Sequence, residues 1–209
     1  MKIIIVLVIF LSIITHAEYP DTTLNKIRER QELIDKASEI FDINGEILSS
    51  IIYVERTENY TWEDEAMDNI LAKGGLNSSI GFCQVKLKTA YFPGKKYSGV
   101  LSLSKSPDEI ITKLGNDSLN IMYAAAYLRI MVSHWEKGGF PIDHRADILG
   151  TLYSTGLFKR DGSERMPNGN PKANWFGEKV FGAIKVVERI REEGKSNCRK
   201  DYQFHGNYI

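Results

Sequence analysis

The sequence contains little cysteine, little proline and no excess of charge of either sign. Two cysteines among 209 residues are too few for a disulfide scaffold or a cysteine-rich zinc module. Six prolines, together with 11% aromatic residues, argue against a disordered chain. The 27 basic residues equal the 27 acidic ones, so no charge imbalance indicates binding to nucleic acid or to anionic lipid. Hydrophobic residues make up 43% of the chain, which is enough for one buried core and favours one domain.

Residues 1–17 differ from the rest of the chain. Lys2 is followed by an apolar run over residues 3–14, and the segment ends in Thr15-His16-Ala17. The run is shorter than the about 20 residues that cross a bilayer, and the small residues Thr15 and Ala17 suit cleavage after Ala17. We therefore expect a signal peptide over 1–17, with an uncleaved anchor as the alternative. The mature protein, residues 18–209, would be secreted or periplasmic and would contain no membrane span.

The mature chain shows helical periodicity over most of its length. Apolar residues recur at helical spacing in segments that predict helices at about 24–41, 44–56, 106–115, 117–138, 143–156 and from 176 to about 190. Asn44, Ser106 and Asp117 stand where helix N-caps are expected. Residues 158–172 are rich in Gly, Pro, Asn and charge, which predicts a long surface loop. Strand patterns hardly appear, so we expect a mainly α-helical domain.

Glu55 carries the first chemical signal. It lies seven residues after Leu48 and four after Ile51, so it continues the apolar face of the 44–56 helix. Desolvation and the negative end of the helix dipole would both raise the pKa of this carboxyl. A carboxyl that is protonated near neutral pH can act as a general acid. The alternative is that Glu55 turns outward and pairs with Arg56 or a lysine.

The sequence around Glu55 resembles lytic transglycosylases of the goose-lysozyme-like superfamily. The block Ser79-Ile80-Gly81-Phe82-Cys83-Gln84-Val85, with Thr89-Ala90 after it, is similar to the family's Gly-Leu-Met-Gln block and later Thr-Ala. Asn120-Ile121, with Ala124 and Tyr127-Leu128, is similar to its Asn-Ile-x-x-Gly-x-x-Tyr-Leu helix, and Leu152–Gly156 to its Ala-Tyr-Asn-Ala-Gly. Glu55 occupies the place of the family's catalytic glutamate. The resemblance covers about residues 44–190 and implies one lysozyme-like domain whose substrate cleft lies between the Glu55 helix and residues 79–90.

The chain departs from the family pattern at several positions. The family's Ser after the glutamate is Arg56 here, its Met before Gln is Cys83, and the Asn of its Tyr-Asn motif is Ser154. An insertion over Thr57–Asn77 contains Tyr60 and Trp62, whose rings would either stack on sugar as a lid or lie on an ordinary surface insertion.

The resemblance implies cleavage of peptidoglycan by one carboxyl. In the family, the glutamate protonates the glycosidic oxygen between N-acetylmuramic acid and N-acetylglucosamine and then deprotonates the muramoyl 6-hydroxyl, which gives a 1,6-anhydromuramoyl product. Two alternatives stay open. A second carboxylate would make the protein a hydrolytic lysozyme, with candidates Glu58, Glu63, Asp64 and Asp68. A pairing of Arg56 with Glu55 would remove the acid and leave an inactive peptidoglycan-binding module.

Further site residues follow from the same motifs. Gln84 can offer an amide to N-acetyl and hydroxyl groups, and Tyr153 can direct its hydroxyl toward Glu55 or toward developing positive charge. The alternatives are an ordinary amide on a helix surface for Gln84 and a core residue for Tyr153. Ser79 is either a ligand or a helix cap, and Tyr127 either a ligand or a packing residue. Cys83 is a further candidate at the cleft; it either forms a disulfide with Cys198 or stays a buried free thiol.

No metal site or cofactor is predicted. The histidines His134, His144 and His205 lack ligand spacing, and Asp161-Gly162-Ser163 does not continue into a calcium-loop pattern. The expected partner is the peptidoglycan glycan strand rather than nucleic acid, and a monomer is the expected state.

Overall fold

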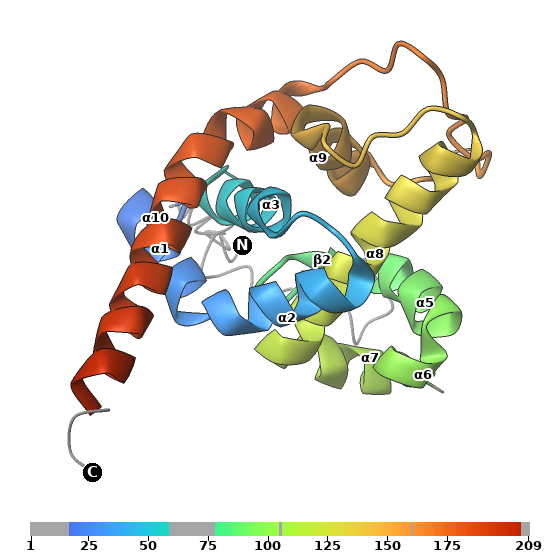
Figure 1. Ribbon diagram of the computed structural model, residues 1–209. Coiled ribbons are helices and arrows are strands. Elements are labelled where there is room, and N and C mark those ends of the chain that lie inside the picture. The colour runs from blue at the N-terminus through green and yellow to red at the C-terminus, as the bar shows by residue number, and fades with distance from the viewer. Residues whose placement is uncertain (1–16, 59–77, 105, 160, 206–209) are drawn as a thin grey trace, which may run out of the picture.

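The computed structural model describes residues 17–58, 78–104, 106–159 and 161–205, with side chains as far as residue 193. The expected signal peptide, apart from Ala17, and residues 59–77 of the insertion lie outside the described residues. The elements in chain order are α1 (Pro20–Glu29), α2 (Gln31–Phe41), α3 (Gly45–Glu58), β1 (Ser79–Ile80), β2 (Val85–Lys86), α5 (Leu87–Lys96), α6 (Ser98–Leu101), α7 (Pro107–Leu114), α8 (Asp117–Lys137), α9 (Ala146–Thr155) and α10 (Trp175–His205). The fold is mainly helical, as predicted (Figure 1).

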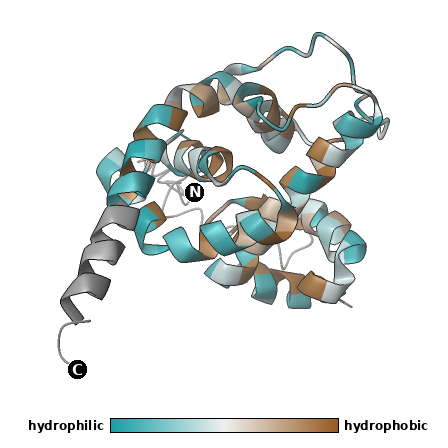
Figure 2. Cartoon of the chain, in the orientation of Figure 1, coloured by the Kyte–Doolittle hydropathy of each residue, from teal (hydrophilic) through white to brown (hydrophobic). Residues whose placement is uncertain are grey.

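Helix α8 lies at the centre of the core. It contacts α2, α5, α7 and α9, and its Ala124, Ala125 and Ala126 are fully buried. Small side chains let the surrounding helices approach this helix closely. Figure 2 shows hydrophilic and hydrophobic residues alternating around outer helices such as α10, the pattern of a helix with one buried face.

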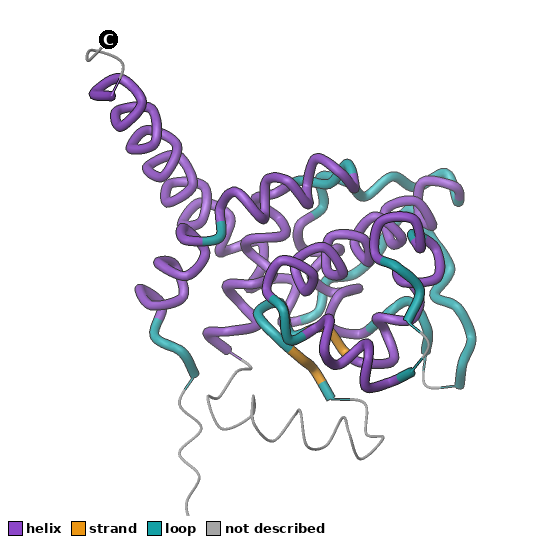
Figure 3. The backbone as a smooth tube through the Cα atoms, turned by 90° about the horizontal axis from the view of Figure 1, so that it is seen from below, coloured by secondary structure: helices purple, strands orange, loops and turns teal. Residues whose placement is uncertain are grey.

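Helix α10 runs along one side of the molecule, where it contacts α9, α3 and α1 (Figure 1). Its crossing with α9 depends on glycine. A Cβ on Gly177 would lie 2.0 Å from the carbonyl oxygen of Asp147, and one on Gly150 would lie 2.9 Å from the side chain of Val180. The last turns of α10 project away from the body of the molecule (Figure 3). Over the described ranges, no helix is both long and apolar enough to span a bilayer.

The predicted caps at Asn44 and Ser106 are confirmed. The Asn44 side-chain oxygen accepts the backbone N–H groups of Glu46 at 2.7 Å and Ile47 at 3.0 Å. The Ser106 hydroxyl accepts the N–H of Glu109 at 3.3 Å. Both satisfy N–H groups that have no partner within their own helix.

Two predictions about helix boundaries were wrong. The N-cap of α8 is Asn116, whose side chain accepts the N–H of Leu119 at 3.1 Å, and Asp117 is the first helical residue. The single helix predicted for about 24–41 is two helices, which separate at Arg30. The Arg30 guanidinium binds Asp117 at 2.7 Å and lies over the ring of Phe82, so a tertiary contact accompanies the break.

Candidate active site

A short hairpin carries the glutamine of the predicted site. Strands β1 and β2 pair antiparallel, and the turn between them is closed by the N–H of Gln84, which donates to the carbonyl of Gly81 at 3.0 Å. Gly81 has a φ of +75°, and a Cβ at this position would lie 2.2 Å from the carbonyl oxygen of Leu114. Only glycine fits there, because a side chain would both strain the backbone and collide with α7.

Asn120 of α8 holds this turn in place through hydrogen bonds of its side chain. Its side-chain oxygen accepts the N–H of Cys83 at 2.7 Å. Its amide nitrogen donates to the carbonyls of Ile80 at 2.8 Å and Leu114 at 2.9 Å. The side chain is fully buried, so these bonds satisfy backbone groups that water does not reach. Asn120 was part of the recognised motif, but its role as the anchor of the turn was not predicted.

Tyr153 of α9 also holds this turn, through a hydrogen bond to its backbone. Its hydroxyl donates to the carbonyl of Cys83 at 2.7 Å. The hydroxyl proton therefore points to the turn, whereas the sequence led us to expect it to point toward Glu55 or toward developing positive charge. Burial raises the pKa of this phenol well above its ordinary value, and the nearby charge of Glu55 adds to the rise. Tyr153 is therefore a neutral residue of the pocket wall.

Gln84 adopts the left-handed conformation, with a φ of +52°, although it is not glycine. Its side-chain nitrogen donates to the carbonyl of Gly81 at 3.0 Å. This described bond uses one of the amide N–H groups, while the amide oxygen can accept from a ligand. Left-handed backbone in a non-glycine residue is strained, and strain of this kind is concentrated at functional sites.

A pocket brings four of the predicted residues together at the C-terminal turn of α3. Its lining consists of Glu55, Gln84, Val85, Lys86, Thr89, Tyr127 and Tyr153. Among these residues of the described chain, Glu55 is the sole carboxyl, and it is partly exposed. Glu55, Gln84, Tyr127 and Tyr153 come from separate elements, so the tertiary fold assembles the pocket.

Ser79 and Cys83 lie outside this lining. Ser79 is a residue of β1 paired with Lys86, so it does not cap a helix. Cys83 is a free, fully buried thiol, the second of the two alternatives, and the side chain of Cys198 lies outside the described residues. Burial raises the pKa of the Cys83 thiol well above its ordinary value, with smaller contributions from Asp117 and Glu55. A buried neutral thiol of this kind is unreactive.

Tyr127 of α8 forms part of the pocket floor. Its ring is buried, and its hydroxyl accepts the N–H of Leu157 at 3.2 Å. Burial raises the pKa of the phenol, while hydrogen bonds with Leu157 and with Thr89 oppose the rise. Tyr127 thus lines the pocket and also anchors the chain that follows α9.

Arg56 is engaged with the N-terminal segment. Its guanidinium donates to the two carboxylate oxygens of Glu18, at 2.6 Å and 3.1 Å, and lies 5.1 Å from the centre of the Phe82 ring. The backbone N–H of Glu18 also donates to the carbonyl of Arg56 at 3.1 Å. Arg56 is buried and does not belong to the pocket lining, and its ion pair with Glu18 joins the N-terminal segment to α3.

Glu58 has a different environment from Glu55 although both lie in the last turn of α3. Its carboxylate binds Lys179 of α10 at 2.8 Å. It lines a separate hollow between α3 and α10, next to Tyr53 and Trp175. Glu58 is therefore not placed to act with Glu55. The other candidates for a second carboxylate, Glu63, Asp64 and Asp68, lie outside the described residues.

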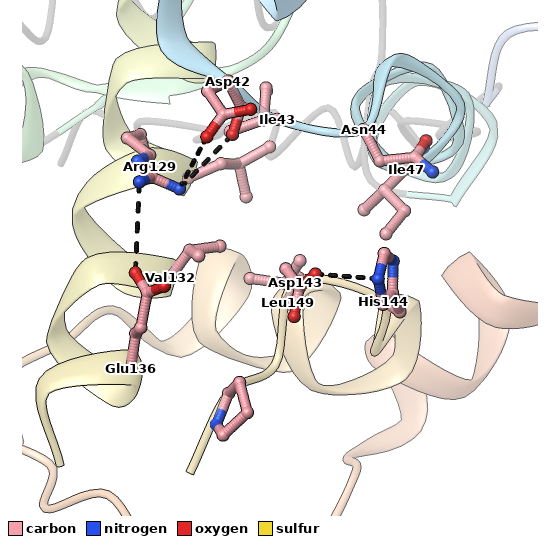
Figure 4. A pocket seen from close by; sticks show the side chains of 12 residues that line it. Asp42, Ile43, Asn44, Ile47, Arg129, Val132, Glu136, Asp143, His144 and Leu149 are labelled. Atoms are coloured by element: carbon pink, nitrogen blue, oxygen red, sulfur yellow. Dashed lines mark hydrogen bonds and ion pairs between the residues drawn. The ribbon is translucent and has the colours of Figure 1, made fainter. Parts of the chain in front are cut away.

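A larger pocket lies at the opposite end of α3, near its first residues, and includes none of the predicted site residues. Figure 4 shows Arg129 in this pocket between Asp42 and Glu136, at 3.4 Å and 3.9 Å, and Asp143 paired with His144 at 2.9 Å. The polar side chains of this pocket bind one another, and none of the residues that the motifs indicated lies among them, so the size of the pocket alone does not make it the site.

The structure supplies no metal-binding cluster in the residues that it describes. In that part of the chain, no three His, Cys, Asp or Glu side chains lie together in a way that could hold a metal ion. His134 bonds to the carbonyl of Arg165 at 2.9 Å, and the side chain of His205 is outside the description.

Comparison with known proteins gives one family. The model of the family described as "T6SS, Peptidoglycan muramidase Tse3, catalytic domain" matches residues 7–133. The matched range includes Glu55, the hairpin turn and Asn120, and it ends before α9 and α10. A search of curated proteins finds no significant match.

Proposed function

The chain belongs to the family of the T6SS peptidoglycan muramidase Tse3 catalytic domain, and on this premise we propose that it cleaves peptidoglycan as a lytic transglycosylase with Glu55 as its acid and base. Membership supports a lysozyme-like enzyme that acts on peptidoglycan. The observation that carries the finer proposal is the pocket itself, in which Glu55 is the one carboxyl among the described lining residues and lies beside Gln84.

In the first step, the Glu55 carboxyl donates its proton to the glycosidic oxygen between the muramoyl and glucosaminyl units. The bond from the muramoyl C1 to this oxygen breaks, and the glucosaminyl unit leaves with a 4-hydroxyl group. The Gln84 amide can hold an N-acetyl or hydroxyl group of the sugar, because it presents an acceptor and a donor beside the acid. Fixing the bond next to the acid is what allows proton transfer at hydrogen-bond distance.

In the second step, the Glu55 carboxylate takes the proton of the muramoyl 6-hydroxyl as its oxygen bonds to C1. The proton that left the carboxyl is thereby replaced, and the product is a 1,6-anhydromuramoyl end. This scheme uses one carboxyl, unlike the pair required by most glycosidases. Asn120 and Tyr153 contribute indirectly, since their hydrogen bonds hold the turn that carries Gln84.

Replacing Glu55 with Gln tests the assignment of the acid. We expect Glu55→Gln to lower turnover of purified peptidoglycan by at least about a thousandfold, because it removes the transferable proton. The melting temperature should stay nearly unchanged, since the side-chain volume is kept. Glu58→Gln is the matched control in the same helical turn, and it should retain activity because Glu58 pairs with Lys179. Equal turnover of wild type and Glu55→Gln would disprove the assignment.

The products distinguish a transglycosylase from a hydrolase. Mass spectrometry of digested peptidoglycan should show muramoyl ends one water lighter than reducing ends, because the substrate's own hydroxyl closes on C1. Mainly reducing ends would instead show that water attacks and that a second carboxylate acts, which is the muramidase reaction. Binding of peptidoglycan without either product would show an inactive module.

We further propose that residues 1–17 are a signal peptide cleaved after Ala17, and that the mature chain is a monomer in the periplasm or outside the cell. Peptidoglycan lies outside the cytoplasmic membrane, so export brings the enzyme to its substrate. N-terminal sequencing of the exported protein should begin at Glu18. Retention of Met1 in the exported form would contradict this cleavage.

A further inference from the structure

A second groove continues from the Glu55 pocket toward the chain that follows α9. It shares Lys86, Thr89, Tyr127 and Tyr153 with that pocket, so the two form one continuous depression. Beyond these residues its lining extends to Lys88, Phe92, Thr155, Gly156, Leu157 and Phe158. The groove is therefore an extension of the candidate active site.

The far wall of the groove is aromatic. Phe92 of α5 and Phe158 stack with ring centres 5.1 Å apart and planes 25° apart. Both remain partly exposed, at 47% and 39%. Gly156, with a φ of +79°, and the bond from the Leu157 N–H to Tyr127 hold the chain that carries Phe158. The aromatic wall is thus fixed in position and open to a ligand.

The near wall of the groove is cationic. Lys86 and Lys88 are both exposed, and the described lining contains no acidic side chain. Lys86 is held in place by its bond to the carbonyl of Ser154 at 3.1 Å. Two aromatic rings and two ammonium groups in the lining of one groove fit a ligand that combines small apolar groups with a carboxylate.

We propose that this groove binds the stem peptide of the muramoyl unit at the bond that Glu55 cleaves. The inference rests on the proposed function. Peptidoglycan differs from plain amino-sugar polymers in that its muramoyl units carry a lactyl group joined to a short peptide with alkyl side chains and free carboxylates. Phe92 and Phe158 contact the alkyl groups, and Lys88 pairs with a carboxylate. The enzyme consequently prefers strands that carry peptides to strands from which the peptides have been removed.

The experiment compares glycan strands with and without stem peptides, the latter prepared with an amidase. For the wild-type enzyme, we expect kcat/KM to be about tenfold higher on peptide-bearing strands, mainly through a lower KM. Phe92→Ala and Lys88→Gln should bring the ratio of the two values close to one. Phe181→Ala is the control, because Phe181 of α10 is 67% exposed and lies outside the groove lining, and it should keep the wild-type ratio.

Equal kcat/KM on both strands for the wild type would overturn the inference, as would equal losses on both strands in Phe92→Ala. Cleavage of peptide-free strands by the wild type tests the proposed function separately. If neither strand is cleaved, NMR titration of the wild-type protein with a muramoyl dipeptide and with muramic acid lacking the peptide decides the question. Tighter binding of the dipeptide supports the groove, and equal binding of both overturns it.

Discussion

The ion pair between Glu18 and Arg56 ties the start of the described chain to the residue that follows Glu55. Glu18 also bonds to Thr23 at 2.8 Å and to Lys26. Although partial burial alone would raise its pKa, these donors lower the pKa of Glu18 from 4.5 to about 2. The carboxylate is therefore much more favourable in the folded protein than in the unfolded chain.

This shift predicts a defined pH dependence of stability. The folded pKa is below the unfolded one, so the stabilisation is complete above about pH 4.5 and is lost as the pH falls toward about 2. Glu18→Gln should cost roughly 2 kcal/mol at pH 7, which lowers the melting temperature by roughly 4–8 °C. Thermal unfolding from pH 7 to pH 3 should show the variant converging on the wild type. Glu29→Gln, which breaks the exposed pair with Arg30, should change stability very little.

Glu55 could be predicted as a site candidate from its place on the apolar face of its helix, and Gln84 from the short motif that contains it; the structure places both in one pocket. The ion pair of Glu18 could not be predicted, because its partner Arg56 is 38 residues further along the chain and the local sequence at neither position indicates a pair. The hydroxyl of Tyr153 was predicted to point toward Glu55 or toward developing positive charge, but it bonds to a backbone carbonyl 70 residues away. Tertiary packing sets the direction of such side chains, and the periodicity of the sequence gives no information about it.

At the scale of elements, helix positions followed closely from the sequence. Capping residues and apolar periodicity predicted α3, α7, α8, α9 and the start of α10, because these signals are local. The break between α1 and α2 at Arg30 was missed, since no glycine or proline marks it and contacts with other elements accompany it. The hairpin of β1 and β2 was also missed, because its strands are too short for a recognisable alternation.

Two glycines of α10 differ in what surrounds them: Gly177 lies at the close crossing with α9, and Gly182 lies away from other elements. Substituting each with Ala therefore distinguishes the effect of the crossing from the effect of helix propensity. Gly177→Ala should destabilise the protein by roughly 2 kcal/mol or more, because its Cβ would lie 2.3 Å from the Thr151 hydroxyl and 2.0 Å from the Asp147 carbonyl. Gly182→Ala should stabilise the protein by roughly 0.5–1 kcal/mol, since apart from the neighbouring backbone of α10 no atom lies within 4 Å of the added Cβ. Urea unfolding of both variants measures the difference. Similar stabilities for the two would show that α10 shifts readily on α9.

At the scale of the molecule, the pocket depends on parts of the chain that are far apart in sequence. Helix α3 supplies Glu55, the hairpin supplies Gln84, and α8 and α9 supply the anchors Asn120 and Tyr153. The family match ends before α9, so the pocket is completed by Tyr153, which lies beyond the matched segment. Truncation after residue 133 would therefore remove Tyr153 from the pocket and α10 from its contact with α3.

Because Cys83 is buried in this arrangement, the reaction of its thiol with a reagent can measure how often the hairpin turn opens. Its N–H bonds to Asn120, its carbonyl bonds to Tyr153, and its thiol has no exposed surface. In a Cys198→Ser background, a thiol reagent can therefore modify Cys83 only after the turn has separated from α8 and α9. We expect slow modification in the native protein and an acceleration of about a hundredfold in Asn120→Ala. Modification of the native protein as fast as in urea would show that the turn is not held. The labelling rate thus reports how often the pocket comes apart, without any substrate present.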